Sequence, residues 1–450
     1  MYKITENEFN EAMNYCLINS DMKQIIQSTK NDTFDKVLSP ERLRQKREKA
    51  IRDELKSRDG ETGEIHDQFY RDHQLLLKLF LYLGVMPIVR SGPGTISFKW
   101  KSPQMAYALI LYCFTTSLVV TVGYERLRIF QTTKKFDDYI YAVIFIIFLA
   151  PHFWIPFVGW GVANEVATYK TMWAHFQVRF YRVTGVSLMF PKLRIMIIIL
   201  FVGCVSLAVV ILYSLSCLLD GFLLWHTIAY FHIITMINMN AALLYINARA
   251  VKEASHSLSA CFKKDTSFDC NSTVVSEYRI LWLNLSEILQ ALGNAYARTY
   301  TTFCLFLSIN ITIAAFGALS EIFDSGFSAK VVGMLILTIY CTTLLFIVCD
   351  CAEAASNVVA EEIQHTLLTL DLSKIEIQTR REIDHFISAI EINPPVICMK
   401  GYSKINRQLL TSLFSKIAVY LIVLVQFKLS IVEQNKYLAN VLANHTSNKP

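Results

Sequence analysis

Charged residues are scarce in this chain: Asp, Glu, Lys and Arg make up 18% of its 450 residues, while 53% are hydrophobic. A globular core cannot use so much apolar side chain, and a soluble enzyme is therefore disfavoured. Glycine and proline are also few, at 16 and 10, which excludes collagen-like and linker-rich classes, and 12% aromatic residues exclude a disordered chain. The composition indicates a protein whose solvent is the lipid bilayer.

The sequence also lacks the residue patterns of catalysis. It contains no His-Glu-x-x-His, no Walker loop and no nucleophile elbow, and its nearest cysteine pair is Cys349-x-Cys351 rather than a metal-type Cys-x-x-Cys. The eleven cysteines are scattered and suggest no disulfide framework. We therefore expect no enzyme activity, no cofactor and no metal site.

Long stretches without any charged residue predict membrane spans. A spanning helix needs about 20 apolar residues, and six stretches of roughly that length or more contain no Asp, Glu, Lys or Arg. A seventh is apolar apart from Lys416 and Lys428, so we predict an interrupted helix there. The fold class is then an all-α membrane protein with seven transmembrane helices, at 104–124, 139–164, 195–219, 221–248, 299–320, 331–349 and 408–432.

The distribution of basic residues predicts the orientation. The first residues, MYKITENEFN, contain no apolar run behind a basic start, so we expect no secretory signal peptide. With the N-terminus inside, Lys and Arg number 18 in the three inner connections and 5 in the three outer ones, which fits the positive-inside rule. We expect a cytoplasmic segment at 1–103, with an interfacial helix near 75–89, and an extracellular tail at 433–450. This orientation disfavours a G-protein-coupled receptor, as does the absence of that class's motifs.

Two connections on the predicted cytoplasmic side have helical periodicity. Leu281, Leu285, Ile288 and Leu292 form an apolar stripe that runs without a break into the fifth span. We predict a cytoplasmic helical insertion at 249–298, and anchor helices at 350–407, where a similar stripe occurs. Such extensions of helices 4 to 7 either pack on one another or form a platform that holds subunits together.

The last span carries the most specific motif. Tyr420 is followed by five hydrophobic residues and then by Gln426 and Phe427. This resembles the signature of insect gustatory receptors, which is Thr-Tyr, five hydrophobic residues and Gln-Phe in the last helix. Val419 stands where the family has Thr. The resemblance extends to the chain length, the seven spans, the inside N-terminus and the short external tail.

The resemblance implies a homotetrameric, ligand-gated, non-selective cation channel of the plasma membrane, with the seventh helices around one pore. A glutamine in an apolar span is costly unless it meets water or a partner, so a lumen suits Gln426. Its alternative is a hydrogen bond to a neighbouring helix of the same subunit. The helical repeat places most of the predicted pore and gate residues on one stripe, and the full set is Ile422, Gln426, Phe427, Ser430 and Glu433.

The expected ligand is a small extracellular molecule, most simply a monosaccharide. Sugars stack on aromatic rings and need hydrogen-bond donors and acceptors. The resemblance favours fructose, because Leu421 stands where the branch for larger sugars tends to carry an acid; the bitter-compound and carbon-dioxide branches stay open. Each candidate alone is more often a contact between helices. The predicted ligand residues are His152, Trp154, Tyr213, Trp225, His226, Tyr230, Asn310, Thr312, Thr338 and Tyr340.

Two rival functions remain open at this point. An odorant-receptor-like subunit would share the architecture, and Tyr420 with the Gln426-Phe427 pair favours taste. A secondary transporter would use His152, Asn310 and Asp350 as a route through the membrane. Transporters usually carry internal repeats and paired broken helices, and neither is evident in this sequence.

Overall fold

A computed structural model describes residues 67–447, apart from 93–94, 133–135, 219–223, 372, 374 and 402. The chain divides into two units, Met1–Gly60 and Glu61–Pro450. Every element named below belongs to the second unit. Residues 1–66 of the predicted cytoplasmic segment lie outside the described residues.

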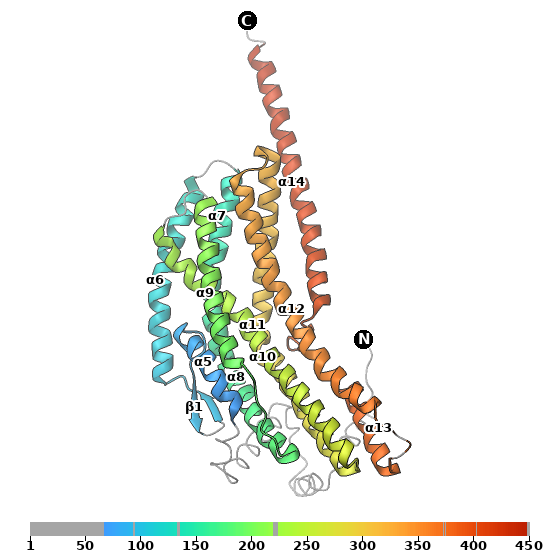
Figure 1. The fold of residues 1–450 in the computed structure, drawn as a ribbon. Coiled ribbons are helices and arrows are strands. Elements are labelled where there is room, and N and C mark those ends of the chain that lie inside the picture. The colour runs from blue at the N-terminus through green and yellow to red at the C-terminus, as the bar shows by residue number, and fades with distance from the viewer. Residues whose placement is uncertain are drawn as a thin grey trace, which may run out of the picture. The chain divides into compact units, whose positions relative to one another are not determined.

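Seven helices are long and apolar enough to cross a membrane, which confirms the predicted fold class for the described part of the chain (Figure 1). Each matches one of the predicted spans. The second span runs from Ala142 to Thr184, so the short helix α7 (Phe136–Leu149) supplies its first part and α8 (Pro151–Thr184) the rest. The seven are α6 (Pro103–Thr132), α8 (Pro151–Thr184), α9 (Leu193–Leu218), α10 (Thr227–Phe268), α11 (Ser272–Ser325), α12 (Ala329–Leu368) and α14 (Arg407–Ser447).

The second span differs from its prediction because it is broken near its middle. The sequence predicts one helix over 139–164, whereas α7 ends at Leu149 and α8 begins at Pro151. Proline has no backbone N–H to donate and fits the first turn of a helix, so Pro151 starts a new helix more readily than it continues an old one.

Helices α10, α11 and α12 form the centre of the bundle and extend far beyond it. They contain 42, 54 and 40 residues, against the ~20 that a bilayer crossing requires. The stripe from Leu281 to Leu292 is buried, and Trp282 donates a hydrogen bond from Nε1 to the carbonyl oxygen of Val359, 2.8 Å away. As the spacing predicts, the stripe continues into the fifth span without a break.

The segment before the first span contains a helix and a hairpin. Helix α5 (Gln68–Tyr82) begins earlier than the predicted interfacial helix and ends where Gly84 adopts a positive φ of 76°. Strands β1 (Ile88–Gly92) and β2 (Thr95–Phe98) then pair antiparallel. Within the described residues before the first span, an all-α prediction omits this hairpin.

The polypeptide before the seventh span presses closely on α11. Helix α13 (Ile377–Ile392) packs on α11 through Phe386 and its neighbours, and a turn around Cys398 follows. A Cβ atom at Gly293 of α11 would lie 2.8 Å from both the backbone nitrogen and the backbone oxygen of Cys398. Only glycine permits this approach.

The seventh span, α14, is one continuous helix of 41 residues, where the sequence predicts an interruption. Lys416 is exposed and leaves the backbone undisturbed, while Lys428 is buried and forms an ion pair with Asp324 of α11. A paired lysine does not need to leave the membrane, and the helix therefore stays intact. Within its own subunit α14 contacts α11 and α12, and it extends beyond both (Figure 1).

Candidate functional site

The middle of α14 presents a broad face that its own subunit does not cover. In the most apolar stretch of this helix, only 11% of the residues are buried. Tyr420, Ile422 and Phe427 are 62%, 58% and 66% exposed, and Gln426, Ser430 and Glu433 are exposed as well. All the predicted motif and pore residues thus lie on surface that is open in one chain.

Gln426 bears on the alternative reading of the motif. If this side chain served only to join helices of one subunit, it would be buried and hydrogen-bonded to a neighbour. It is exposed, and within the described part of the chain the structure gives it no hydrogen-bond partner. Its side-chain amide can therefore form hydrogen bonds with water or with a group outside the subunit.

Charged contacts hold α14 to its own subunit at both ends of the span. At the beginning, Arg407 donates from Nη2 and Nε to Asp350 Oδ1, at 2.6 and 2.9 Å, and its backbone nitrogen donates to Glu353. Near the other end, Lys428 donates to the backbone oxygen of Ser320, 2.7 Å away, and forms its ion pair with Asp324. The two helices that pack on α14 supply these partners.

Among the described residues, two of the cavities between the helices are candidate sites, and each has room for about one water molecule. Cavity 1 lies between α8, α10 and α11 and is lined by Pro151, Trp154, Ile155, Ile237, Asn240, Thr299, Thr302, Phe303 and Phe306. Cavity 2 lies between α7, α9, α10 and α12 and is lined by Ile144, Phe145, Phe148, Leu212, Leu215, Tyr230, Ile234 and Leu337. The lining of cavity 2 is apolar except for Tyr230, whose hydroxyl donates to the backbone oxygen of Phe145 at 3.0 Å.

The ten predicted ligand residues do not gather around one cavity. Trp154 lines cavity 1, with its ring edge-on to Phe306, and Tyr230 lines cavity 2. Tyr213 and Trp225 point outward and are 71% and 40% exposed. Their role in binding stays a prediction.

Most of the other predicted ligand residues are engaged in contacts within the bundle. His152 is hydrogen-bonded through Nε2 to Thr116, at 2.8 Å. Tyr340 donates its hydroxyl to Asn238 Oδ1, at 2.6 Å, and so joins α12 to α10. His226 lies between Arg126 and Glu125, while Asn310, Thr312 and Thr338 each donate to a carbonyl oxygen one turn earlier in their own helix.

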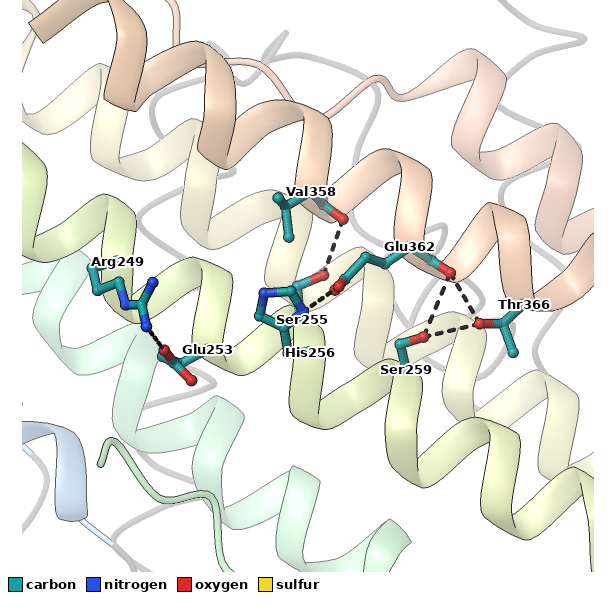
Figure 2. Close-up of polar contacts among 8 residues, drawn as sticks. All are labelled: Arg249, Glu253, Ser255, His256, Ser259, Val358, Glu362 and Thr366. Carbon is teal, nitrogen blue, oxygen red and sulfur yellow. Dashed lines mark hydrogen bonds and ion pairs between the residues drawn. The ribbon is translucent and has the colours of Figure 1, made fainter. Parts of the chain in front are cut away.

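A polar seam joins α10 to α12 in the long extensions of these helices, as Figure 2 shows. Ser255 donates to the carbonyl oxygen of Val358, His256 pairs with Glu362, and Ser259 is hydrogen-bonded to Thr366 at 2.9 Å. Serine and threonine hydroxyls let two helices approach closely while they satisfy each other's polar groups. The seam holds the extensions together where the sequence predicts helical packing.

Seven membrane-crossing helices around a packed interior, with the last helix left open on one side, define a multi-pass helical membrane protein. The family model described as "7tm Chemosensory receptor" matches residues 73–431. The chain belongs to this family, the insect gustatory and odorant receptors, whose members are ligand-gated cation channels and not enzymes. It is accordingly a multi-pass protein of the plasma membrane.

Two curated relatives cover most of the chain. Gustatory and odorant receptor 22 of Anopheles gambiae is 38% identical over 388 residues, which are 84% of this chain and 83% of the relative. Gustatory and odorant receptor 21a of Drosophila melanogaster is 38% identical over 371 residues, 81% of this chain and 82% of the relative. The olfactory receptor OR5 of Machilis hrabei, solved in complex with eugenol, shares the fold, with a TM-score of 0.51 at 11% identity; the match covers 80% of this chain and 99% of that one.

Several structural features are not evident in the sequence. In the sequence, Lys428 indicates only an interruption of the seventh span. Asp324, near the end of the fifth span, is the signal for an acidic partner that compensates its charge. The apolar residues of cavity 2, such as Phe145 and Leu337, are not evident either, because nothing distinguishes them in sequence from any other buried residue. Pro151 was the visible sign of the break beside cavity 1.

Proposed function

We propose that this chain is a chemosensory cation channel, assembled as a homotetramer, in which α14 lines a central pore opened by a small extracellular molecule. The open face of α14 is the observation that carries the proposal. It holds Gln426, Phe427 and Ser430 with no cover from their own subunit. Four such faces around one axis would give apolar rings that close by dewetting, with amide groups between them and Glu433 at the outer mouth to attract cations.

The proposed ligand site is cavity 2. Its residues lie within a few turns of the connections that the basic-residue count places outside, at 125–138 and 321–330. A small cavity whose one lining hydroxyl, that of Tyr230, is already hydrogen-bonded to Phe145 suits a very small molecule of low polarity. The sequence leaves three ligand classes open: sugars, bitter compounds and carbon dioxide. Of these, only carbon dioxide is both small enough and apolar enough to enter cavity 2 without a large rearrangement. Carbon dioxide is therefore the lead ligand.

A monosaccharide such as fructose is the second candidate, and cavity 1 favours it. There the indole of Trp154 could stack on a sugar, and Asn240, Thr299 and Thr302 bring polar groups. The cavity would have to widen considerably to admit a sugar, because it holds about one water in this conformation. Such widening needs binding energy that favours the open state.

The deciding experiment records current from cells that express only this chain. Carbon dioxide is raised at constant external pH by raising bicarbonate in proportion, and acidification without carbon dioxide serves as the control. Fructose and a panel of bitter compounds are applied separately. We expect an inward cation current with carbon dioxide alone. A current with fructose, reduced in Trp154→Ala, would instead support the second candidate, and no current with any compound would contradict a channel of this chain alone.

A further inference from the structure

Lys428 is a buried charge one residue beyond the Gln-Phe pair of the motif. It is 6% exposed. Its ammonium group donates to the backbone oxygen of Ser320 at 2.7 Å, to the hydroxyl of Ser320 and to the carboxylate of Asp324. All three acceptors lie at one end of α11, so a single side chain joins the pore helix to this neighbour.

The burial of Lys428 makes this contact stronger than an ordinary surface ion pair. The side chain of Lys428 is 7% exposed, whereas that of its partner Asp324 is 34% exposed. A charge inside a bilayer is expensive unless its partners replace water, so the loss of Asp324 would leave the buried ammonium group poorly compensated. The contact at the opposite end of the span has a more exposed cation, since the side chain of Arg407 is 62% exposed. Exposed pairs contribute little. Of these two charged contacts, the one made by Lys428 fixes the position of α14 more firmly.

Helix α11 connects this contact to the proposed ligand site. It is a single helix from Ser272 to Ser325. Phe306 of α11 packs edge-on against Phe148, which lines cavity 2, with ring centroids 5.5 Å apart. From Phe306 to Ser320 the helix rises about 20 Å. A shift of Phe148 would therefore reach Ser320 and Asp324 through one packed contact and one continuous helix.

The position of Lys428 around α14 completes the path. Successive residues of a helix are 100° apart, so Lys428 lies roughly opposite Gln426. It holds the back of the same turn whose front presents Gln426 and Phe427. A movement of α11 would displace this turn in particular.

We propose that Lys428 is a positioning residue, held by Ser320 and Asp324. Through it, α11 transmits ligand binding to the turn of α14 that presents Gln426 and Phe427. The inference rests on the proposed channel function but not on the identity of the ligand. The contact is required for efficient opening, whereas ligand binding and ion conduction in the open state do not depend on it.

The test compares Lys428→Met with Lys416→Met, which removes an exposed lysine from the same helix. Current is recorded at saturating carbon dioxide or, if the panel selects it, fructose, and is normalised to surface protein. We expect Lys428→Met to lower the maximal open probability about fivefold or more, with unchanged single-channel conductance. Lys416→Met should behave like the wild type. Lys428→Arg keeps the cation and should restore most of the response.

Two further variants distinguish a loss of signal transmission from a loss of folded protein. They are Asp324→Asn and the double exchange of Lys428→Asp with Asp324→Lys. Asp324→Asn should mimic Lys428→Met, and the exchange should recover more response than either single change, since it rebuilds the pair. If Lys428→Met and Asp324→Asn keep the full open probability, or if their effects simply add, the inference is overturned. A wild type silent to every ligand would count against the proposed function; spontaneous open probability, measured in the same variants, would still decide the inference by the same comparison.

Discussion

At the scale of single residues, cavity 2 is small enough for one substitution to fill it. Leu337 lines it and is buried. We expect Leu337→Phe to occupy the space and to raise the carbon dioxide concentration for half-maximal current by about tenfold or more, a loss of about 1.4 kcal/mol of binding free energy. Concentration–response recordings at constant pH measure this shift.

Ile155→Phe is the matched control, because it adds similar bulk to cavity 1. Overpacking costs about 1–3 kcal/mol of stability at either position, so surface expression must be measured for both variants. If Ile155→Phe abolishes the response and Leu337→Phe does not, the ligand binds in cavity 1 and the assignment to cavity 2 is wrong.

The sequence located polar residues inside the membrane but not their partners. Tyr340 was a candidate for binding sugar hydroxyls, and its hydroxyl instead satisfies Asn238. A polar group within a spanning helix needs a hydrogen-bond partner. The sequence does not tell whether that partner is another helix or a ligand, because this depends on how the helices pack. Gln426 was predictable as a pore candidate because its motif has a fixed spacing, and its place in a pore stays a prediction.

At the scale of elements, the approach of the Cys398 turn to α11 depends on Gly293. We expect Gly293→Ala to lower the thermal stability of the purified protein, by about 1–3 kcal/mol in free energy of unfolding, since its methyl group would collide with backbone atoms. Thermal unfolding in detergent measures the effect.

Gly203→Ala provides the control for that change. Gly203 also lies within a spanning helix, but a Cβ there meets nothing within 4 Å. Alanine is the better helix former, so this variant should be unchanged or slightly more stable. Equal losses in both variants would mean that the close approach at Gly293 is not the cause.

The helices were predictable where charge is absent over a full span, because hydrocarbon permits only paired backbone groups and hence helices. The predicted spans differ from the structure where the effect of one residue depends on its neighbours in the fold. Pro151 splits the second span, and Lys428 leaves the seventh intact because Asp324 lies beside it. The hairpin of β1 and β2 could not be foreseen from apolar periodicity, since its strands contain only five and four residues.

At the scale of the whole molecule, the distribution of basic residues predicts the orientation. An epitope tag at Met1 should be protected in intact cells, and one at Pro450 should be accessible to antibody added outside. The sequon at Asn444 would then be external. Staining before and after permeabilisation tests this, and an N-terminal tag that is accessible from outside would overturn the assignment of cytoplasmic and extracellular ends.

The assembly was visible in the sequence only through the resemblance to a family. A single chain shows which face of α14 lacks cover, but apolar residues there would suit lipid as well as a pore. The proposed pore would be formed by several copies together, and measurements of ion flow test it.

The most direct test places a cysteine at Gln426 and applies a cationic, water-soluble thiol reagent while the channel is active. The account predicts progressive and lasting loss of cation current in Gln426→Cys, because the modified side chain adds positive charge to the pore. Leu424→Cys, on the side of α14 that packs against its own subunit, should be unaffected, as should the wild type. If the cysteine at position 426 is shown to be modified and the current persists unchanged, α14 does not line the pore.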